Sequence, residues 1–372
     1  MKTKRSKKDI RQTVTRVILR CFLVLFTLVI LAGIGMWMML DKIFNGPSES
    51  ARDILTMSLL EPSATKWIPG LFLGDEKVNE IRARTGTALP SDVSTPSQVT
   101  INTNTNTNSD EWKDYPDGIK IETVYGDTYT AHVMIIRNPA DVYLATSTEK
   151  FSLDIPGTRI HNQIETEGAI AAINAGAFND DGTSGSYVGS LPTGLVISGG
   201  EVVWDDGKSY EGFVGFNTDN ILVVATSMTA AKAKELNIRD GCCFGPVLIM
   251  NGTINDIEYS SNSGFNPRTA IGQRADGSII FVCIDGRQVG SLGGTYSDII
   301  NIMVEYGAVN ACNLDGGSSS VMLYRDTYGR YGEDKKHWGN DIAMINNYSL
   351  LQQDPRRMPT FFMVRPAGSE EQ

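Results

Sequence analysis

Four short stretches place polar side chains at the ends of apolar runs: "AAINAGAFND" (171–180), "NPRTAIG" (266–272), "VCIDGRQ" (282–288) and "NLDGGSSS" (313–320). Their chemistry-bearing residues are Asn174, Arg268, Asp285, Arg287, Asn313 and Asp315. Carboxylates can serve as acids, bases or nucleophiles, and guanidinium groups match phosphate oxygens in a two-pronged geometry. These residue types suit acid–base chemistry on an anionic substrate.

Taken singly, each stretch also has an ordinary structural explanation. The first is typical of a strand followed by a turn, and an Arg at a strand start, such as Arg268, is usually solvated. Asp285 and Arg287 could form a surface ion pair, and Asp-Gly-Gly turns are common. Four such stretches in one chain, each at a strand end, favour convergence at one site.

The elements that must position these residues are mainly strands. Hairpins are predicted at 119–137, 195–204, 213–225, 248–256 and 269–286, with Gly-Asp, Gly-Gly, Asn-Gly and Asp-Gly among their turns. Helices are predicted over 229–237 and 296–307, and the second feeds directly into "NLDGGSSS". The predicted class is α+β, with a mainly antiparallel or mixed sheet core, a few packed helices and one N-terminal transmembrane helix.

An uncharged run of twenty residues, "CFLVLFTLVILAGIGMWMML", occupies positions 21–40. Its length suits a membrane-spanning helix, whereas a cleaved signal peptide has a shorter apolar region and a small-residue cleavage site. The basic residues 1–20 favour a cytoplasmic N-terminus, so the remainder is expected outside the cell as a single-pass membrane protein. We predict a basic tail (1–20), a span (21–40), a stalk with a short helix near 50–60 (41–115), and a catalytic domain (116–368).

Charge and cysteine content limit the function classes. The first 40 residues hold eight Lys or Arg and one acid, while the whole chain has a formal net charge of −10. The body is therefore strongly acidic, which argues against nucleic-acid binding. Cys242, Cys243, Cys283 and Cys312 lack metal-site spacing and are interpreted as small core residues or one incidental disulfide.

The ordered segments "INAGAF", "GPVLIMNG", "NPRTAIG", "VCIDGR" and "NLDGGSSSVM" resemble the phosphodiester glycosidase family, including its bacterial members linked to exopolysaccharide biosynthesis. The resemblance covers about residues 119–366. This chain has "NAGAF" where the family has a Gly-Gly-Phe-Phe-like run, and Ser318 where a third Gly is usual. Its C-terminal segment "RRMPTFFMVRP" lacks the Asn of the family's usual strand.

The resemblance implies hydrolysis of a sugar 1-phosphodiester in a cell-envelope or exopolysaccharide glycan. Asp315 is the expected nucleophile or general base, and Asp285 its acid–base partner or the group that orients Arg287. Arg268 and Arg287 are expected to hold phosphate, and Asn174 and Asn313 to bind sugar hydroxyls or a water. The remaining expected substrate-binding residues are Gly176, Gly286, Gly316, Gly317, Ser318 and Ser319.

Other chemistries receive less support from the residues. The three His residues have no ligand spacing, so no metal or cofactor is predicted, although oxygen ligands in the Gly-rich turns leave a cation such as calcium open. A Ser nucleophile at 318–320 lacks the following helix of a Gly-x-Ser-x-Gly elbow. The alternative function is a non-catalytic module that binds phosphate-linked wall or capsule polymers.

Overall fold

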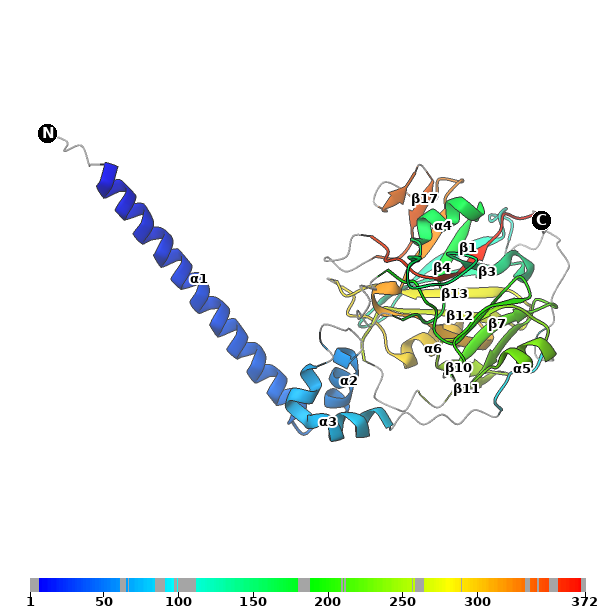
Figure 1. The fold of residues 1–372 in the computed structure, drawn as a ribbon, viewed down its shortest axis with the longest axis horizontal. Helices are drawn as coiled ribbons and strands as arrows, with labels where there is room; N and C mark the ends of the chain where they lie inside the picture. The colour runs from blue at the N-terminus through cyan, green and yellow to red at the C-terminus, as the bar shows by residue number, and fades with distance from the viewer. Residues whose placement is uncertain are drawn as a thin grey trace. The chain divides into compact units, whose positions relative to one another are not determined.

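The computed structural model describes residues 7–60, 65, 67–83, 91–96, 99, 112–179, 188–208, 210, 212–255, 257, 264–288, 290–331, 335–339, 341–347 and 354–368. The chain divides into two compact units, residues 1–82 and 83–372. The first consists of helices and the second mainly of strands (Figure 1). Much of the predicted stalk, including its Asn/Thr run, lies outside the described residues.

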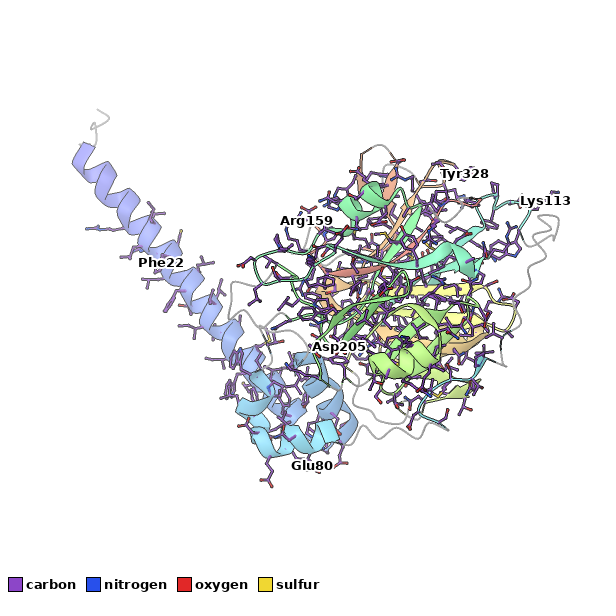
Figure 2. The ribbon with its side chains drawn as sticks, turned by 45° about the vertical axis from the view of Figure 1, so that its right-hand side comes forward. Phe22, Glu80, Lys113, Arg159, Asp205 and Tyr328 are labelled. Carbon is purple, nitrogen blue, oxygen red and sulfur yellow. The ribbon has the colours of Figure 1, made fainter. Side chains whose placement is uncertain are left out.

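Unit 1 contains α1 (Lys7–Phe44), α2 (Glu49–Leu60) and α3 (Ile68–Ala83). Within α1, the segment Arg16–Phe44 is long and apolar enough to cross a membrane, and its most apolar window is not buried by the described chain. Side chains such as Phe22 project outward from this helix (Figure 2). The helix extends beyond both ends of the predicted span, and α2 confirms the helix predicted near residues 50–60.

Helix α3 is absent from the sequence prediction. Its first half, "IPGLFL", contains Pro69 and Gly70, and Gly74 interrupts the helix with φ +75° and ψ 158°. Pro at the first helical turn is well tolerated because its missing N–H has no intrahelical acceptor there. The kink breaks the apolar period between Leu73 and Val78, so the stretch does not show one continuous helical face.

Unit 2 contains three sheets among its described residues, and every strand pairing within them is antiparallel. The seven-stranded sheet runs β1 (Ile119–Tyr125), β2 (Thr130–Ile136), β13 (Ile279–Ile284), β12 (Arg268–Arg274), β14 (Ala308–Leu314), β10 (Val247–Met250), β11 (Thr253–Ile254). The six-stranded sheet runs β16 (His337–Trp338), β17 (Ile342–Met344), β15 (Met322–Arg325), β4 (Ala171–Asn174), β18 (Thr360–Val364), β3 (Val142–Thr146). The five-stranded sheet runs β6 (Glu201–Asp205), β5 (Leu195–Ser198), β9 (Ile238–Cys242), β7 (Phe213–Asn217), β8 (Leu222–Ala225).

In the part of unit 2 that the structure describes, three α-helices pack on these sheets. Helix α6 (Tyr296–Glu305) begins with a capping box in which Thr295 and Asp298 bond reciprocally, and it lies beside β12 and β13 (Figure 1). Helix α5 (Ala230–Glu235) is capped by the Thr229 side chain. Helix α4 (Ile160–Glu167), which the sequence analysis does not predict, packs on the six-stranded sheet through Ile160 and Ile164. The predicted α+β class is confirmed.

The main core is shared by the three sheets. Met134 from the seven-stranded sheet, Phe362 from the six-stranded sheet and Phe216 from the five-stranded sheet belong to one buried cluster. A second cluster fills the space between the opposite face of the seven-stranded sheet and α6. Burying a large apolar side chain contributes roughly 1.5–3 kcal/mol. Strand ends anchored in these cores can therefore hold polar groups rigidly.

Candidate functional site

Strand register brings the predicted residues to one edge of the seven-stranded sheet. Arg268, at the start of β12, lies opposite Ile284 at the end of β13, and Thr269 lies opposite Leu314 at the end of β14. Asp285 and Asp315 therefore leave the sheet at the same edge, which we call the site edge and define by Arg268, Ile284 and Leu314. The convergence expected from the sequence is present in the backbone pairing.

Asp315 is held from the neighbouring six-stranded sheet. Its backbone N–H donates to the carbonyl of Ala175 at 3.1 Å, and its own carbonyl accepts from Asn174 Nδ2 at 2.6 Å. The residue is half-buried, so solvent still reaches it. Two sheets thus fix the backbone from which the carboxylate projects.

Gly316 and Gly317, which follow Asp315, are each required for a different structural reason. Gly317 adopts φ +60°, in the left-handed region, and its N–H donates to the carbonyl of Pro267 at 2.8 Å. A Cβ on Gly316 would lie 2.9 Å from that same carbonyl oxygen. The turn therefore requires Gly317 for its conformation and Gly316 for close approach to the start of β12.

Asn174 is fully buried, and its side-chain amide both donates and accepts hydrogen bonds. Besides donating to Asp315, it accepts at Oδ1 from Thr269 Oγ1 at 2.8 Å and from the Val321 backbone N–H at 3.1 Å. The side chain thereby joins β4 to β12 and to both flanks of the Gly/Ser turn. This geometry favours a positioning role over the predicted contact with sugar hydroxyls.

Asp285 lies at the centre of a buried network that the sequence analysis did not detect. His132 Nε2 bonds to its Oδ1 at 3.0 Å, and the backbone N–H of Asn347 donates to the same oxygen at 2.8 Å. Its Oδ2 accepts from Asn347 Nδ2 at 2.9 Å and from Gln288 Nε2 at 3.0 Å. With this many partners and only 1% exposure, the carboxylate is suited to orienting its neighbours.

The two predicted arginines differ sharply in exposure. Arg268 is 3% exposed, donates from Nε to Gly294 and from Nη2 to Gly264, and stacks on the Tyr296 ring at 3.9 Å. Arg287 is exposed and donates to the Phe265 carbonyl and the Asn266 side chain. Arg268 therefore braces the loops beside the site edge, whereas Arg287 retains contact with solvent.

Unsatisfied polar atoms concentrate in the motif that contains Asp315. Asn313 donates from Nδ2 to Gly245 at 3.0 Å, but its Oδ1 is buried without a partner in the described structure. The hydroxyls of Ser319 and Ser320 are likewise buried without a partner there. Burying a polar group unpaired is costly, so three within eight residues indicate a segment that gains partners from water or a ligand.

Ser318 provides the exposed end of the same motif. Its hydroxyl accepts from Arg356 Nη1 at 3.2 Å, and the Arg356 guanidinium also lies 4.8 Å from the Phe178 ring centre. Arg356 belongs to "RRMPTFFMVRP", a segment in which the sequence alone predicted no site residue. Only the three-dimensional packing of residue 356 on the Gly/Ser turn could identify it.

The other predicted glycines lie in packed backbone. A Cβ on Gly176 would lie 2.9 Å from Cys242 Cβ and 3.2 Å from the Cys243 carbonyl oxygen. Its N–H donates to Thr360 Oγ1, and the Gly286 N–H donates to the Asn347 carbonyl at 3.0 Å. Gly176 thus permits close packing behind Asp315, and Gly286 supports the Asp285 network.

The cysteines of unit 2 are free and buried, which resolves the two predicted alternatives in favour of core residues. Burial raises the pKa of the Cys242 and Cys283 thiols well above the usual value, and that of Cys243 to about 11. They remain neutral at physiological pH. Among the described residues, no group of three His, Cys, Asp or Glu side chains is arranged to hold a metal ion.

Residues 167–365 match the family model described as phosphodiester glycosidase. A curated relative, the SPbeta prophage-derived uncharacterized protein YomE of Bacillus subtilis, is 29% identical over 130 residues, which cover 34% of this chain and only 20% of that protein. The zebrafish N-acetylglucosamine-1-phosphodiester alpha-N-acetylglucosaminidase catalytic domain, auto-inhibited by its pro-peptide, aligns with TM-score 0.49 at 18% identity, covering 66% of this chain and 82% of that one. A hypothetical protein from Synechocystis aligns with TM-score 0.43 at 16% identity, covering 68% and 63%. Because the family model spans more than half of its length, this chain belongs to the phosphodiester glycosidase family.

Proposed function

We propose that the protein hydrolyses a sugar 1-phosphodiester, cleaving the bond between the anomeric carbon and the phosphate oxygen. The substrate class is a phosphate-linked glycan of the cell envelope or an exopolysaccharide. Family membership supports the phosphodiester-linked sugar, and the arrangement around Asp315 supports the location of the chemistry. The α1 helix supports a membrane anchor, with the basic N-terminus in the cytoplasm and unit 2 outside.

The observation that carries this proposal is the fixed, solvent-reached Asp315 beside a buried segment with unmet hydrogen bonds. The Asp315 backbone is held by Ala175 and Asn174, while Asn313 Oδ1 and the Ser319 hydroxyl lack partners among the described residues. An amide oxygen can accept a bond from a sugar hydroxyl, and a serine hydroxyl can donate one to phosphate. The segment therefore combines a reactive carboxylate with unused donors and acceptors.

Positive charge for the phosphate comes from Arg356 and Arg287 in this proposal. Arg356 reaches Ser318 on the exposed side of the turn, and Arg287 is exposed near the site edge. Arg268 is a weaker candidate than the sequence suggested because its guanidinium is buried against Tyr296 and backbone carbonyls. Guanidinium groups bind phosphate oxygens through paired hydrogen bonds, which fixes the orientation of the diester.

The chemical roles follow from the difference between the two carboxylates. Asp315 either attacks the anomeric carbon, forming a glycosyl ester that water then hydrolyses, or removes a proton from the attacking water; in both cases the phosphate monoester departs with the bridging oxygen. The monoester is a good leaving group, so strong protonation by a second acid is less important than in ordinary glycosides. Asp285 instead holds His132, Gln288 and Asn347 in place.

The test uses the full-length protein in detergent and a panel of hexose and N-acetylhexosamine 1-phosphate methyl esters. Release of reducing sugar together with methyl phosphate is expected from the wild type. Asp315→Asn should lower the rate at least ~100-fold, since acid–base groups typically contribute that much. The matched control is Asp276→Asn at the far turn of the β12–β13 hairpin, which should keep full activity.

Two results would contradict the proposal. Binding of a phosphate-linked wall polymer without any sugar release from the panel would indicate the non-catalytic module. Full activity of Asp315→Asn would remove this carboxylate from the chemistry even if the wild type hydrolyses the substrate.

A further inference from the structure

The first half of α3 packs against the end of the membrane-spanning helix. The Phe72 ring lies 4.6 Å from the Trp37 ring and 4.9 Å from the Phe44 ring, measured between centroids. Trp37 precedes Asp41, the first charged residue after the apolar run, by four positions. At about 1.5 Å per residue, Trp37 lies roughly 6 Å along the helix from that charge. Phe72 therefore sits at the depth of the bilayer interface if α1 spans the membrane.

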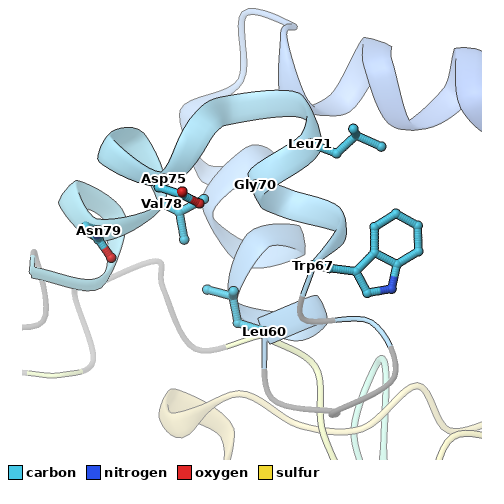
Figure 3. A pocket seen from close by; sticks show the side chains of 7 residues that line it. All are labelled: Leu60, Trp67, Gly70, Leu71, Asp75, Val78 and Asn79. Atoms are coloured by element: carbon cyan, nitrogen blue, oxygen red, sulfur yellow. The ribbon is translucent and has the colours of Figure 1, made fainter.

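Two large apolar side chains next to Phe72 remain outside the core of unit 1. Trp67 is 62% exposed and Leu71 is 56% exposed, whereas Val78 and Ile81 in the second half of α3 are buried. Trp67 and Leu71 line one end of an open pocket, and Asp75 and Asn79 line its other end (Figure 3). Trp67, immediately before α3, and Leu71, in its first half, thus lie at the end of the helix that contacts α1.

The kink at Gly74 separates apolar from charged sequence. Residues 68–73, "IPGLFL", contain no charge, while Asp75, Glu76 and Lys77 follow the kink directly. Lys77 pairs with Glu80 at 2.7 Å on the exposed surface of the second half. An uncharged half packed against a membrane span, followed by a charged half, is the composition expected of a segment that lies at a lipid surface and then leaves it.

We infer that Trp67 and Leu71 insert into the outer interface of the lipid bilayer, making the first half of α3 a second membrane contact beside α1. Trp is favoured at this depth because its ring is apolar while its indole N–H meets the headgroup region. The contact holds α2 and α3 against the membrane surface instead of letting them extend freely from the span. The inference goes beyond hydrolysis and depends only on α1 crossing the membrane.

The experiment places single cysteines in the full-length protein with Cys21 changed to Ser. The positions are Leu71→Cys and Trp67→Cys in the proposed contact, Leu25→Cys within the span, and Asn79→Cys as a matched exposed site on the same helix. Each variant is labelled with the fluorophore NBD in its native state, where the cysteines of unit 2 are buried. The protein is reconstituted in phosphatidylcholine–phosphatidylglycerol nanodiscs with or without doxyl-labelled lipid.

Labels at 67, 71 and 25 are expected to lose fluorescence to doxyl lipid and to resist quenching by aqueous iodide, while the label at 79 does the reverse. Iodide quenching at 67 and 71 equal to that at 79 would overturn the inference, provided that 25 is quenched by doxyl lipid. If 25 is also quenched only by iodide, α1 does not span the bilayer and the inference falls with it. Protection of 67 and 71 from both quenchers would indicate a protein cover, such as a second copy, and would also overturn it. Each result is independent of enzymatic activity.

Discussion

Replacing Asn174 with Ala should damage both stability and catalysis because three polar groups bond to its buried amide. The Asp315 carbonyl, the Thr269 hydroxyl and the Val321 N–H would each lose a partner, and both Thr269 and Val321 are fully buried. A lost hydrogen bond costs about 1 kcal/mol net, and a buried group left unpaired costs about 1–3 kcal/mol. Since the penalties are not additive and some groups find new partners, we expect a total of about 3–5 kcal/mol.

Urea unfolding of the full chain in detergent, followed by tryptophan fluorescence, measures that loss. Thr269→Val is the matched control because it removes one donor to Asn174 and preserves side-chain shape, and it should cost about 1 kcal/mol. Loosening of the Asp315 backbone should also lower kcat about 10- to 100-fold on a substrate that the wild type hydrolyses. An Asn174→Ala protein within about 1 kcal/mol of wild type would refute the claim that this amide clamps the turn.

Three further predictions concern the surroundings of the site. Arg356→Ala should raise KM for a sugar 1-phosphodiester roughly tenfold, because a charge-assisted hydrogen bond to phosphate is lost. The control Arg274→Ala, at the far end of β12, should leave KM unchanged. Equal steady-state kinetics for the two variants would exclude the proposed phosphate contact. Gly176→Ala should lower the unfolding free energy by about 1–3 kcal/mol because its Cβ would crowd Cys242, and an unchanged urea midpoint would contradict this packing. Because burial shields the Cys243 thiol and raises its pKa to about 11, iodoacetamide at pH 9 should label Cys243 much more slowly in the native protein than in the unfolded protein; equal labelling of the two, measured by mass spectrometry of the peptides, would contradict this.

The hairpins could be predicted because their turns carry local chemical signals. Gly199 and Gly200, Asn251 and Gly252, and Gly277 all adopt positive φ, as the Gly-Gly, Asn-Gly and Asp-Gly sequences indicate. Helix α6 could also be predicted from the sequence, because a capping residue precedes its apolar period. The tight turn at Gly277 sets the register of β12 against β13, whereas the pairing of β14 with β12, which places Asp315, is non-local and does not follow from a turn. Local sequence therefore specified most of the scaffold beneath the site.

The direction in which each polar side chain points could not be predicted in the same way. A strand-end position does not reveal whether Arg268 faces α6 or solvent, or that Asn174 bridges two sheets. The Asp285 network depends on His132 and Asn347, which are 153 and 62 positions away in sequence. Helix α3 was missed for a local reason, because Pro69 and the kink at Gly74 interrupt its apolar period.

The proposed reaction breaks the sugar carbon–oxygen bond of a sugar 1-phosphodiester at Asp315. Hydrolysis of a defined ester in oxygen-18 water tests it most directly, because the solvent oxygen marks the atom that is attacked. We expect label in the released sugar, none in the phosphate, and loss of the reaction in Asp315→Asn. Label in the phosphate would identify a phosphodiesterase and contradict the role given to Asp315.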